Sequence, residues 1–361
     1  MPDTTEDILV EIPDDDLPKL LDMYEKHKNW APYVYSIILT GIEWRRKRKE
    51  KYTIFLSPNN CWKQDGTFFV LLTVKMTEGE QDILQDIPDE DLPKLAELYD
   101  KHKNCAPYVY STIMTGIDWR RKKKEKYLIF MSPNGCWRED GTFFVLLKYY
   151  SFDIFIFSLD DTGKNIYEGI RKTKRLDTGD FRDRPPLLYS IHNKFYQIVV
   201  KAFKDKGISM TQEIPCHMFS IPRQEALKFE TKCPPEVYIK KLDTSHAELV
   251  NSEWPHRYKD SVKFVSLLIE MNEGYGLFLK SNDEMVSWAL LSMLGQLTMV
   301  QTVDCHKKKG YGSLMVKYLS KIIANKGYSP FGTILEENRA SIYMFQKLGF
   351  NNLGISIYSL Y

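Results

Sequence analysis

Hydrophobic and polar residues follow two different periods along the chain, and each period predicts one kind of element. Between 314 and 323, leucine, methionine, tyrosine and isoleucine recur at helical spacing, with lysines on the other faces. This pattern predicts an amphipathic helix that starts near Gly310 and stops at Gly327. Short apolar runs bounded by turn residues predict strands nearby. These strands cover 237–242, 275–280, 284–291, 296–303, 331–335 and 355–360.

The front of the chain contains one pattern twice. Residues 7–72 and 82–147 align without a gap, and 17 of the 66 aligned positions differ. Each copy predicts two helices, a basic run, and two strands joined by a turn of hairpin type. After the second copy, strand-forming and helix-forming residues continue to about residue 230, whereas the first copy is followed by a polar linker. We therefore predict that the first copy is an unfinished domain, which lacks the elements that follow the second copy.

These patterns predict a mixed α/β protein with three parts: a duplicated half-domain at 1–76, an α/β domain at 82–230 and a mixed-sheet domain at 234–361. Two near-identical copies would compete for one packing position against residues 148–230. The duplication thus predicts a homodimer, or an exchange of one copy for the other within a chain.

Composition narrows the function classes. Lysine and arginine number 50 against 48 acidic residues, so no net charge favours a nucleic-acid or membrane partner. The basic runs at 44–51 and 119–126 resemble nucleic-acid patches, but each follows an apolar helix, whose C-terminal end attracts cations. Nucleic-acid binding, which predicts salt-dependent association, is the disfavoured alternative.

Targeting and metal signals are absent from the sequence. No apolar run reaches the roughly 18 residues of a membrane span, and the acidic N-terminus lacks the features of a targeting peptide. We expect a cytoplasmic protein, with a mitochondrial location left open. The six cysteines are scattered, without zinc-ligand spacing, which predicts no metal site.

The segment HKKKGYGSLM, residues 306–315, carries the clearest chemical signal. Gly310 and Gly312 allow close backbone approach at a predicted helix start, where unpaired N–H groups and the helix dipole favour an anion. Lys307, Lys308 and Lys309 add positive charge. The pattern matches neither a Walker loop nor a dinucleotide fingerprint. Taken alone, it leaves open whether the segment is a solvated charged loop or a phosphate site.

Two ordered motifs decide between these alternatives. The segment TVDCHKKKGYGSLMVKYL, followed by ILEENRASIYMFQKLGF, resembles the GCN5-related N-acetyltransferase superfamily, whose acyl-CoA loop precedes a helix. VNSEWPHR, SWALLSMLGQLTM and CWREDGTFF narrow the resemblance to glycine N-acyltransferase-like proteins of the invertebrate type. The resemblance covers about residues 82–361. It implies a C-terminal acyl-CoA N-acyltransferase fold, a degenerate acyltransferase-like α/β domain before it, and an extra copy of that domain's first half.

The resemblance also implies a site for acyl-CoA or acetyl-CoA as co-substrate, with no metal and a small amine or amino acid such as glycine as acceptor. Main-chain groups of Thr302 and Val303 would contact pantetheine, and a strand N–H near Val300 would stabilise the oxyanion. The pyrophosphate would be held by Lys307, Lys308, Lys309, Gly310, Tyr311 and Gly312. The thiol end would be lined by Asn338, Ser341 and Phe345.

The chain departs from this family at two positions. Gln296 stands where mammalian glycine N-acyltransferases carry a glutamate general base, and Phe345 stands where many acetyltransferases have a tyrosine that protonates the thiolate. His256 is a candidate replacement base, with a turn residue bonded to backbone as the alternative interpretation. We therefore predict an acyl-CoA-dependent N-acyltransferase, with an inactive CoA-binding or protein-interaction descendant as the alternative.

Overall fold

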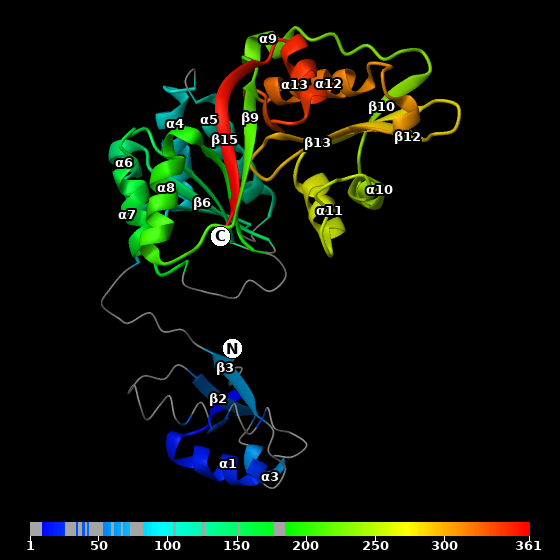
Figure 1. The fold of residues 1–361 in the computed structure, drawn as a ribbon. Helices are drawn as coiled ribbons and strands as arrows, with labels where there is room; N and C mark the ends of the chain where they lie inside the picture. The colour runs from blue at the N-terminus through cyan, green and yellow to red at the C-terminus, as the bar shows by residue number, and fades with distance from the viewer. Residues whose placement is uncertain are drawn as a thin grey trace, which may run out of the picture. The chain divides into compact units, whose positions relative to one another are not determined.

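The computed structural model describes residues 9–25, 34, 38, 39, 42, 53–58, 61–65, 68–72, 82–103, 106–123, 127–149, 152–176 and 185–361. The chain divides into two compact units, residues 1–81 and residues 82–361 (Figure 1). The basic run at 44–51 lies outside the described residues.

The smaller unit is a three-stranded antiparallel sheet with a short helical layer. Its elements are β1 (Leu9–Glu11), η1 (Asp14–Asp16), α1 (Leu17–Glu25), β2 (Thr53–Pro58), α3 (Trp62–Asp65) and β3 (Phe69–Leu72), with strand order β1-β2-β3. Its turn is built like the same turn in the second copy: Ser57 Oγ accepts from the Trp62 N–H at 3.0 Å, and Ser132 Oγ accepts from the Trp137 N–H at 3.0 Å. The described parts of the two copies therefore share this local structure.

The larger unit contains one element order twice. The first series, the N half (residues 82–220), comprises β4 (Leu84–Asp86), η2 (Asp89–Asp91), α4 (Leu92–Asp100), α5 (Pro107–Lys122), β5 (Leu128–Pro133), α6 (Trp137–Asp140), β6 (Phe143–Lys148), β7 (Phe152–Phe157), α7 (Lys164–Lys172), β8 (Leu187–His192), α8 (Asn193–Lys206) and β9 (Gln212–Ser220). The short helix α9 (Arg223–Leu227) follows.

The second series, the C half (residues 237–361), comprises β10 (Val237–Lys241), η3 (Thr244–His246), α10 (Ala247–Ser252), α11 (Ser261–Met271), β11 (Gly274–Leu279), β12 (Met285–Leu291), β13 (Leu297–Thr302), η4 (Asp304–His306), α12 (Tyr311–Asn325), β14 (Phe331–Leu335), α13 (Arg339–Lys347) and β15 (Asn351–Leu360). The strands and the helix predicted for this region are confirmed within a few residues at their ends. The helix starting after Gly310 is α12.

The two halves exchange their last strands. Among the described residues of this unit, twelve strands form one sheet in the order β10-β11-β12-β13-β14-β9-β15-β8-β7-β6-β5-β4. Strand β9 of the N half pairs with β14, and β15 of the C half pairs with β8. Figure 1 shows β9 and β15 side by side at the centre of the unit. The predicted mixed α/β fold is confirmed, while the boundary between 230 and 234 stays a prediction because this sheet continues across it.

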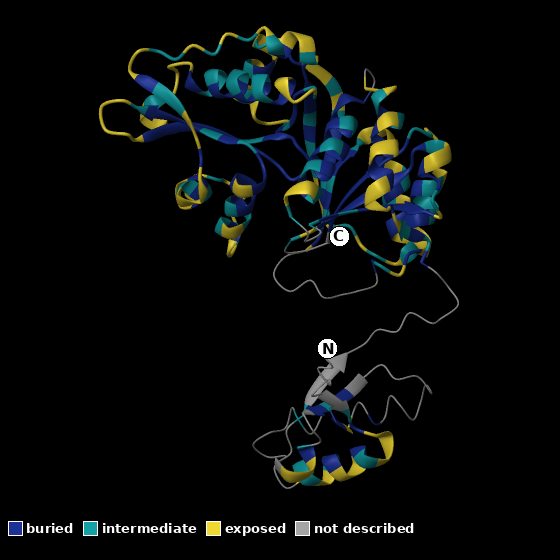
Figure 2. Ribbon diagram, turned by 180° about the vertical axis from the view of Figure 1, so that it is seen from behind, coloured by how far each residue is buried: buried dark blue, intermediate teal, exposed yellow. Residues whose placement is uncertain are grey.

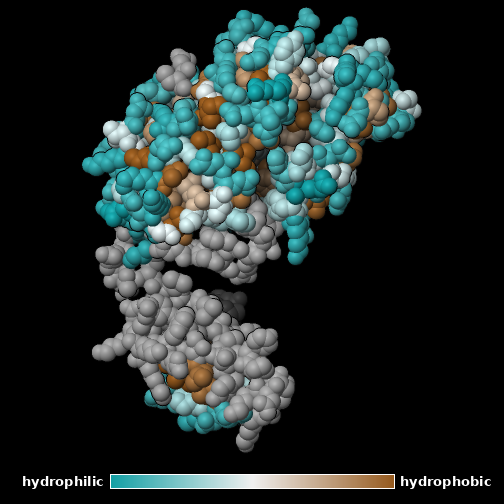
Figure 3. All heavy atoms as spheres, in the orientation of Figure 1, coloured by the Kyte–Doolittle hydropathy of each residue, from teal (hydrophilic) through white to brown (hydrophobic). Residues whose placement is uncertain are grey.

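Helix layers cover both sides of the sheet and bury its strands (Figure 2). In the C half, α12 and α13 lie on one side of β13, and α10 and α11 lie on the other (Figure 1). The apolar runs at 143–148 and 152–157 form β6 and β7, and most of their side chains are buried. The visible outer face of this unit is mainly hydrophilic (Figure 3).

Helix α5 of the N half bonds directly to the C half. Trp119 Nε1 donates to Asn272 Oδ1 at 2.7 Å, Thr112 Oγ1 donates to the Leu294 carbonyl at 3.2 Å, and Lys122 Nζ donates to the Met271 carbonyl at 2.6 Å. Lys122, at the basic end of this helix, therefore bonds within the fold. Residues 124–126 of the same basic run lie outside the described residues.

None of the described helices has the length and apolar character needed to cross a bilayer. The described residues also contain no cluster of three or more His, Cys, Asp or Glu side chains placed to hold a metal ion.

Candidate functional site

Strands β13 and β14 are parallel, and they meet at one end only. Among the described residues, Leu297 and Gly332 are the single ladder pair between them, although the strands continue to Thr302 and Leu335. We call residues 298–302 and 333–335 the splay, and the Leu297–Gly332 pair its vertex. Backbone groups that β13 turns toward β14 in the splay have no ladder partner there.

The ladder on the other side of β13 shows which groups face the splay. The Val303 N–H donates to the Val286 carbonyl at 2.9 Å, so this pair is of the hydrogen-bonded kind. In an antiparallel ladder the neighbouring pair, Ser287 and Thr302, is then of the non-bonded kind, and its backbone groups point away. Thr302 therefore turns its main chain to the splay. Val303 does not, because its N–H is used in the sheet and its carbonyl accepts from the His306 N–H.

A β-bulge interrupts β13 inside the splay. The register with β12 shifts between Trp288 and Leu290, and Met299 has a φ of +48°. Two residues, Met299 and Val300, thus stand opposite one, which re-aims the backbone locally. Val300, two positions before Thr302, carries an N–H inside this bulge. This is the N–H group for which the resemblance implies oxyanion contact.

The lysine-glycine loop, residues 303–310, connects the open end of the splay to α12. Gly310 is the N-cap residue of α12 with φ +81°, a conformation that side chains resist. The first helical bond runs from the Leu314 N–H to the Gly310 carbonyl at 3.0 Å, so the preceding N–H groups have no intrahelical acceptor. A Cβ added at Gly312 would lie 3.4 Å from Thr302 Oγ1. The first turn of α12 therefore lies against the end of β13.

The lysines of this loop are exposed and make local contacts. Lys307 Nζ lies 2.5 Å from Asp304 Oδ1, and Lys309 Nζ lies 3.2 Å from His306 Nδ1. Lys308 has a φ of +63°. Tyr311 is buried, and its hydroxyl donates to Glu236 Oε1 at 2.9 Å, so its side chain anchors the helix rather than facing a ligand.

A cleft of about 840 Å³ lies beside the start of α12. Its walls come from residues 228–234, α12 and α13. The lining is Lys228, Phe229, Glu230, Lys232, Pro234, Lys309, Gly310, Tyr311, Ser313, Leu314, Lys317, Met344, Lys347 and Leu348. Five of these residues are lysines and one is acidic, so the cleft favours a polyanion.

The second predicted motif lies on α13. Asn338 caps this helix, and its Oδ1 accepts from the Ser341 N–H at 3.1 Å. Phe345 is buried, and a Cβ at Gly332 would lie 3.6 Å from its ring. Phe345 therefore packs against the vertex from the α13 side, whereas Asn338 is exposed at the start of the helix.

The vertex also holds a hydroxyl that sequence reasoning missed. Tyr358 of β15 reaches across β9, and its hydroxyl lies 2.8 Å from Thr333 Oγ1. Gln296 Nε2 donates to the same oxygen at 3.5 Å, and Ser292 Oγ donates to Gln296 Oε1 at 3.4 Å. Burial raises the pKa of Tyr358 to about 12. No local pattern marks this residue, because the exchange of β9 and β15 brings it here.

His256 lies elsewhere, in the exposed loop between α10 and α11, with its ring centroid 6.4 Å from that of Trp254. A small cavity of about 20 Å³ is lined by Tyr258 of that loop and not by His256. The other lining residues are Leu147, Tyr149, Asp153, Tyr189, Phe264 and Met293. Tyr189 connects the cavity to the vertex, since its ring centroid is 5.0 Å from that of Tyr358. The role predicted for His256 gains no support from this placement.

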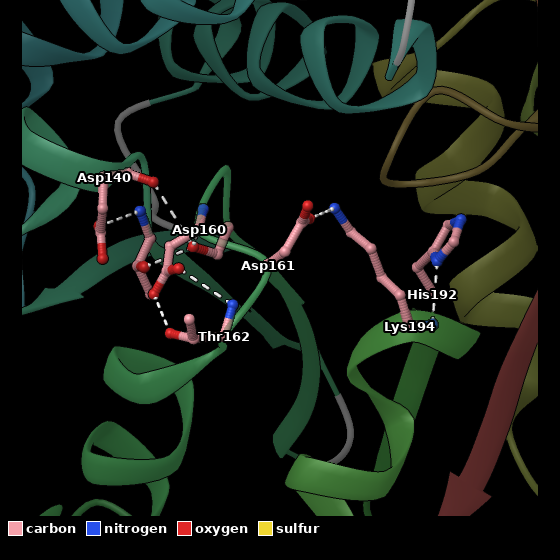
Figure 4. A network of polar contacts seen from close by, with 8 residues as sticks. Asp140, Asp160, Asp161, Thr162, His192 and Lys194 are labelled. Carbon is pink, nitrogen blue, oxygen red and sulfur yellow. Dashed lines mark hydrogen bonds and ion pairs between the residues drawn. The ribbon is translucent and has the colours of Figure 1, made fainter.

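The N half has its own splay with different chemistry at its end. Strands β7 and β8 are parallel, and Ile154 and Leu188 are their one ladder pair among the described residues. Gly163, at φ +61°, is the N-cap of α7. Asp160 accepts from the Thr162 N–H at 3.0 Å, and Asp161 pairs with Lys194 (Figure 4). Carboxylates thus occupy the place that lysines hold in the C half.

Comparisons with known proteins agree with this architecture. Residues 274–358 match the FR47-like protein family, and residues 8–77 and 83–202 both match a domain of unknown function (DUF5645). The chain is 27% identical over 110 residues to human glycine N-acyltransferase-like protein 2, a match that spans 30% of this chain and 37% of the human protein. A Drosophila protein solved by X-ray crystallography superposes with a TM-score of 0.70 at 19% identity, over 78% of this chain and 99% of that one.

The fold and the family matches are those of acyltransferase-like proteins. The chain belongs to the DUF5645 family, whose two matches cover more than half of its length, and to the GCN5-related N-acetyltransferase superfamily. The two DUF5645 matches coincide with the internal repeat seen in the sequence.

Proposed function

We propose that this protein is an acyl-CoA-dependent N-acyltransferase that conjugates a small amine or amino acid such as glycine. One observation carries the proposal: the free N-terminal turn of α12 lies at the open end of the splay and faces a cleft lined by five lysines. A diphosphate bound there would meet N–H groups, the positive end of the helix dipole and mobile cations. The family resemblance is the reason for proposing acyl-CoA as the ligand that carries this diphosphate.

The proposed cofactor site follows the geometry. Main-chain groups of Thr302 bind pantetheine, while Val303 holds the end of β13 in the sheet. The loop and helix start, residues 307–312, hold the pyrophosphate. Asn338 and Ser341 shape the start of α13, and Phe345 forms the apolar wall at the vertex.

The proposed reaction is direct attack of the amine on the thioester. The N–H of Val300 stabilises the oxyanion, and the splay holds the thioester in line with the acceptor. Gln296 cannot accept a proton because its amide is neutral. An ordered water takes the proton of the ammonium form, or His256 does so after the α10–α11 loop moves.

Two assays test this proposal. A thermal-shift series with CoA, acetyl-CoA and benzoyl-CoA should raise the melting temperature with ligand concentration, because a ligand that binds the native state stabilises it. Release of free thiol from the acyl-CoAs should then require an amine such as glycine. Binding without turnover across a panel of amines would favour the non-catalytic CoA-binding alternative. No shift with any CoA would refute both.

We also propose that the first copy exchanges with the second. Trp119, which bonds to Asn272, corresponds to Trp44 in the first copy. The first copy would then rescue a chain whose second copy is damaged. Trp119→Ala should destabilise a chain that lacks residues 1–76 more than it destabilises the full chain, as measured by denaturant unfolding. Equal losses in the two backgrounds would refute exchange, and a concentration-dependent melting temperature would place it between two chains.

A further inference from the structure

The phenol of Tyr358 lies where β13 and β14 meet. Its oxygen contacts Thr333 Oγ1 at 2.8 Å and Gln296 Nε2 at 3.5 Å. Gln296 directly precedes Leu297, and Thr333 directly follows Gly332. Since Leu297 pairs with Gly332, both partners of the phenol flank the vertex of the splay.

Strand pairing identifies the side of the sheet on which Tyr358 lies. Tyr358 pairs with Ile214 of β9, so it shares a face with Ile214 and with Met218 four residues on. Phe219 points to the other face, where its ring lies 5.9 Å from Phe345 of α13. Tyr358 therefore approaches the vertex from the side away from α13, the side on which α10 and α11 lie.

A thioester bound as proposed would bring its sulfur to this point. With its diphosphate at the lysine-glycine loop, the pantetheine arm follows β13 from Thr302 toward Leu297. The acyl end then lies beside the bulge at Met299 and next to the phenol. This step rests on the proposed function.

We propose that Tyr358 is a catalytic residue that hydrogen-bonds to the sulfur of CoA and relays a proton to it from the attacking amine. The neutral amine forms the C–N bond, and the C–S bond breaks with its electron pair on sulfur. Sulfur takes the phenol proton, and the phenolate takes the proton released by the new amide nitrogen. The phenol is regenerated, and one proton has moved from nitrogen to sulfur.

The surroundings of Tyr358 suit this relay. Because burial raises its pKa to about 12, the phenol stays protonated at neutral pH, and its phenolate is a strong enough base to recover the proton. Thr333 and Gln296 fix the position of the oxygen. The role is otherwise unfilled here, since Phe345 has no hydroxyl.

The first test compares Tyr358→Phe with Tyr343→Phe, a matched control on α13 whose side chain is 65% exposed. We expect Tyr358→Phe to lower kcat on the order of 100-fold with acetyl-CoA or benzoyl-CoA and glycine. The acyl-CoA Kd and the melting temperature should stay within about twofold and about 2 °C of the wild-type values. An unchanged kcat, or a loss that follows weakened binding and melting, would overturn the proposal.

A second test needs no turnover. CoA and its analogue without the thiol group differ only at the sulfur, so their affinity ratio reports on contacts to it. We expect the wild-type protein and Tyr343→Phe to favour CoA by about fivefold, the equivalent of one hydrogen bond. Tyr358→Phe should bring the ratio near one. A wild-type protein without turnover would refute the proposed function, and the ratio would still decide whether Tyr358 touches sulfur.

Discussion

The N half and the C half each contain a splay between two parallel strands, but the loops that lead from the splay to the next helix differ in charge. Among the described residues, both place a single ladder pair between two parallel strands, and both begin the next helix with a glycine in the left-handed conformation, Gly163 and Gly310. The connecting loops diverge. Residues 158–163 carry two aspartates and no lysine, whereas residues 303–310 carry three lysines and one aspartate.

This difference predicts that a free helix N-terminus is not enough for a phosphate site. In the N half, Asp160 accepts from both the N–H and the hydroxyl of Thr162 (Figure 4). The Thr162 hydroxyl in turn accepts from the Lys164 N–H at the first residue of α7 at 3.3 Å, although the N-cap Gly163 provides no side-chain cap. The Asp160 carboxylate beside this helix start repels a second anion. In the C half no side-chain cap bonds to the start of α12. We infer that the C half alone binds acyl-CoA, and that the N half supports it through β9 and α5.

The largest effect should come from exchanging the two capping glycines for valine. Gly310→Val should weaken acyl-CoA binding by about 100-fold or more, because a β-branched residue resists φ +81° and the loop must rearrange away from the ligand. Gly163→Val carries similar strain and meets Ile198 at 3.0 Å, yet should leave CoA affinity within twofold. Calorimetric titration with CoA measures both.

The control for this pair is Gly327→Val, at the far end of α12, where φ is +100° and no atom lies within 4 Å of an added Cβ. It should lower the melting temperature and leave binding unchanged. Equal loss of affinity in all three variants would mean that instability, not loop shape, governs binding.

A smaller effect should follow removal of the loop charges. Replacing residues 307–309 by alanine should weaken CoA binding by about tenfold, since exposed cations contribute up to about 1 kcal/mol each and are screened by salt. The loss should shrink between 50 and 500 mM NaCl. A matched triple variant of Lys164, Lys172 and Lys201 removes the same charge from the N half and should bind as the wild-type protein does. Salt-independent loss would contradict an electrostatic role.

Removal of the carboxylate at the N-half loop should have a still smaller effect, on stability alone. Hydrogen bonds from Thr162 lower the pKa of Asp160, so its contribution is present above the unfolded pKa near 3.8 and is lost as pH falls through the lower folded pKa. Asp160→Ala removes the acceptor of two hydrogen bonds from Thr162 and should cost about 1 kcal/mol of unfolding free energy at pH 7. The difference from wild type should vanish near pH 2. Urea unfolding at both pH values measures it.

Asp161→Ala is the control for this prediction, because the Asp161 side chain is 85% exposed and its ion pair with Lys194 contributes little. A loss for Asp160→Ala that is the same at pH 2 and pH 7 would contradict the assigned role. CoA affinity should not change in either variant.

Local patterns in the sequence predicted the C half well and the links between halves poorly. Helix α12 was readable because Met315, Leu319 and Ile323 repeat at helical spacing on a buried face and glycines stand at both ends. The exchange of β9 and β15 was not readable, since pairing between strands about 140 residues apart leaves no local pattern. The residues of the candidate site fall into the same two groups: those predictable from local sequence and those placed by pairing between distant strands.

Within the site, the loop at 307–312 lies along consecutive residues, so motif spacing located it. Tyr358 could be assigned to the site only from the structure, because β15 pairs with β8 and β9 of the other half. The bulge at Met299 likewise depends on pairing with strand β12. The role of His256 stays a prediction: its chemistry suits a base, and its loop leaves it exposed. Residue type alone does not place a side chain at a reaction centre.

The smallest effect should come from removing residues 1–76. The described residues of the first copy close their own small core, with Ile12, Leu17, Leu20 and Phe55 fully or almost fully buried, and the larger unit contains both splays without it. The truncated chain should therefore bind acyl-CoA within twofold of the full chain and melt within about 2 °C of it, as measured by calorimetric titration and circular dichroism. If turnover instead disappeared while the melting transition stayed intact, the first copy would belong to the catalytic unit. A comparison of the N half with the C half alone would then not account for catalysis, because the first copy would also be required.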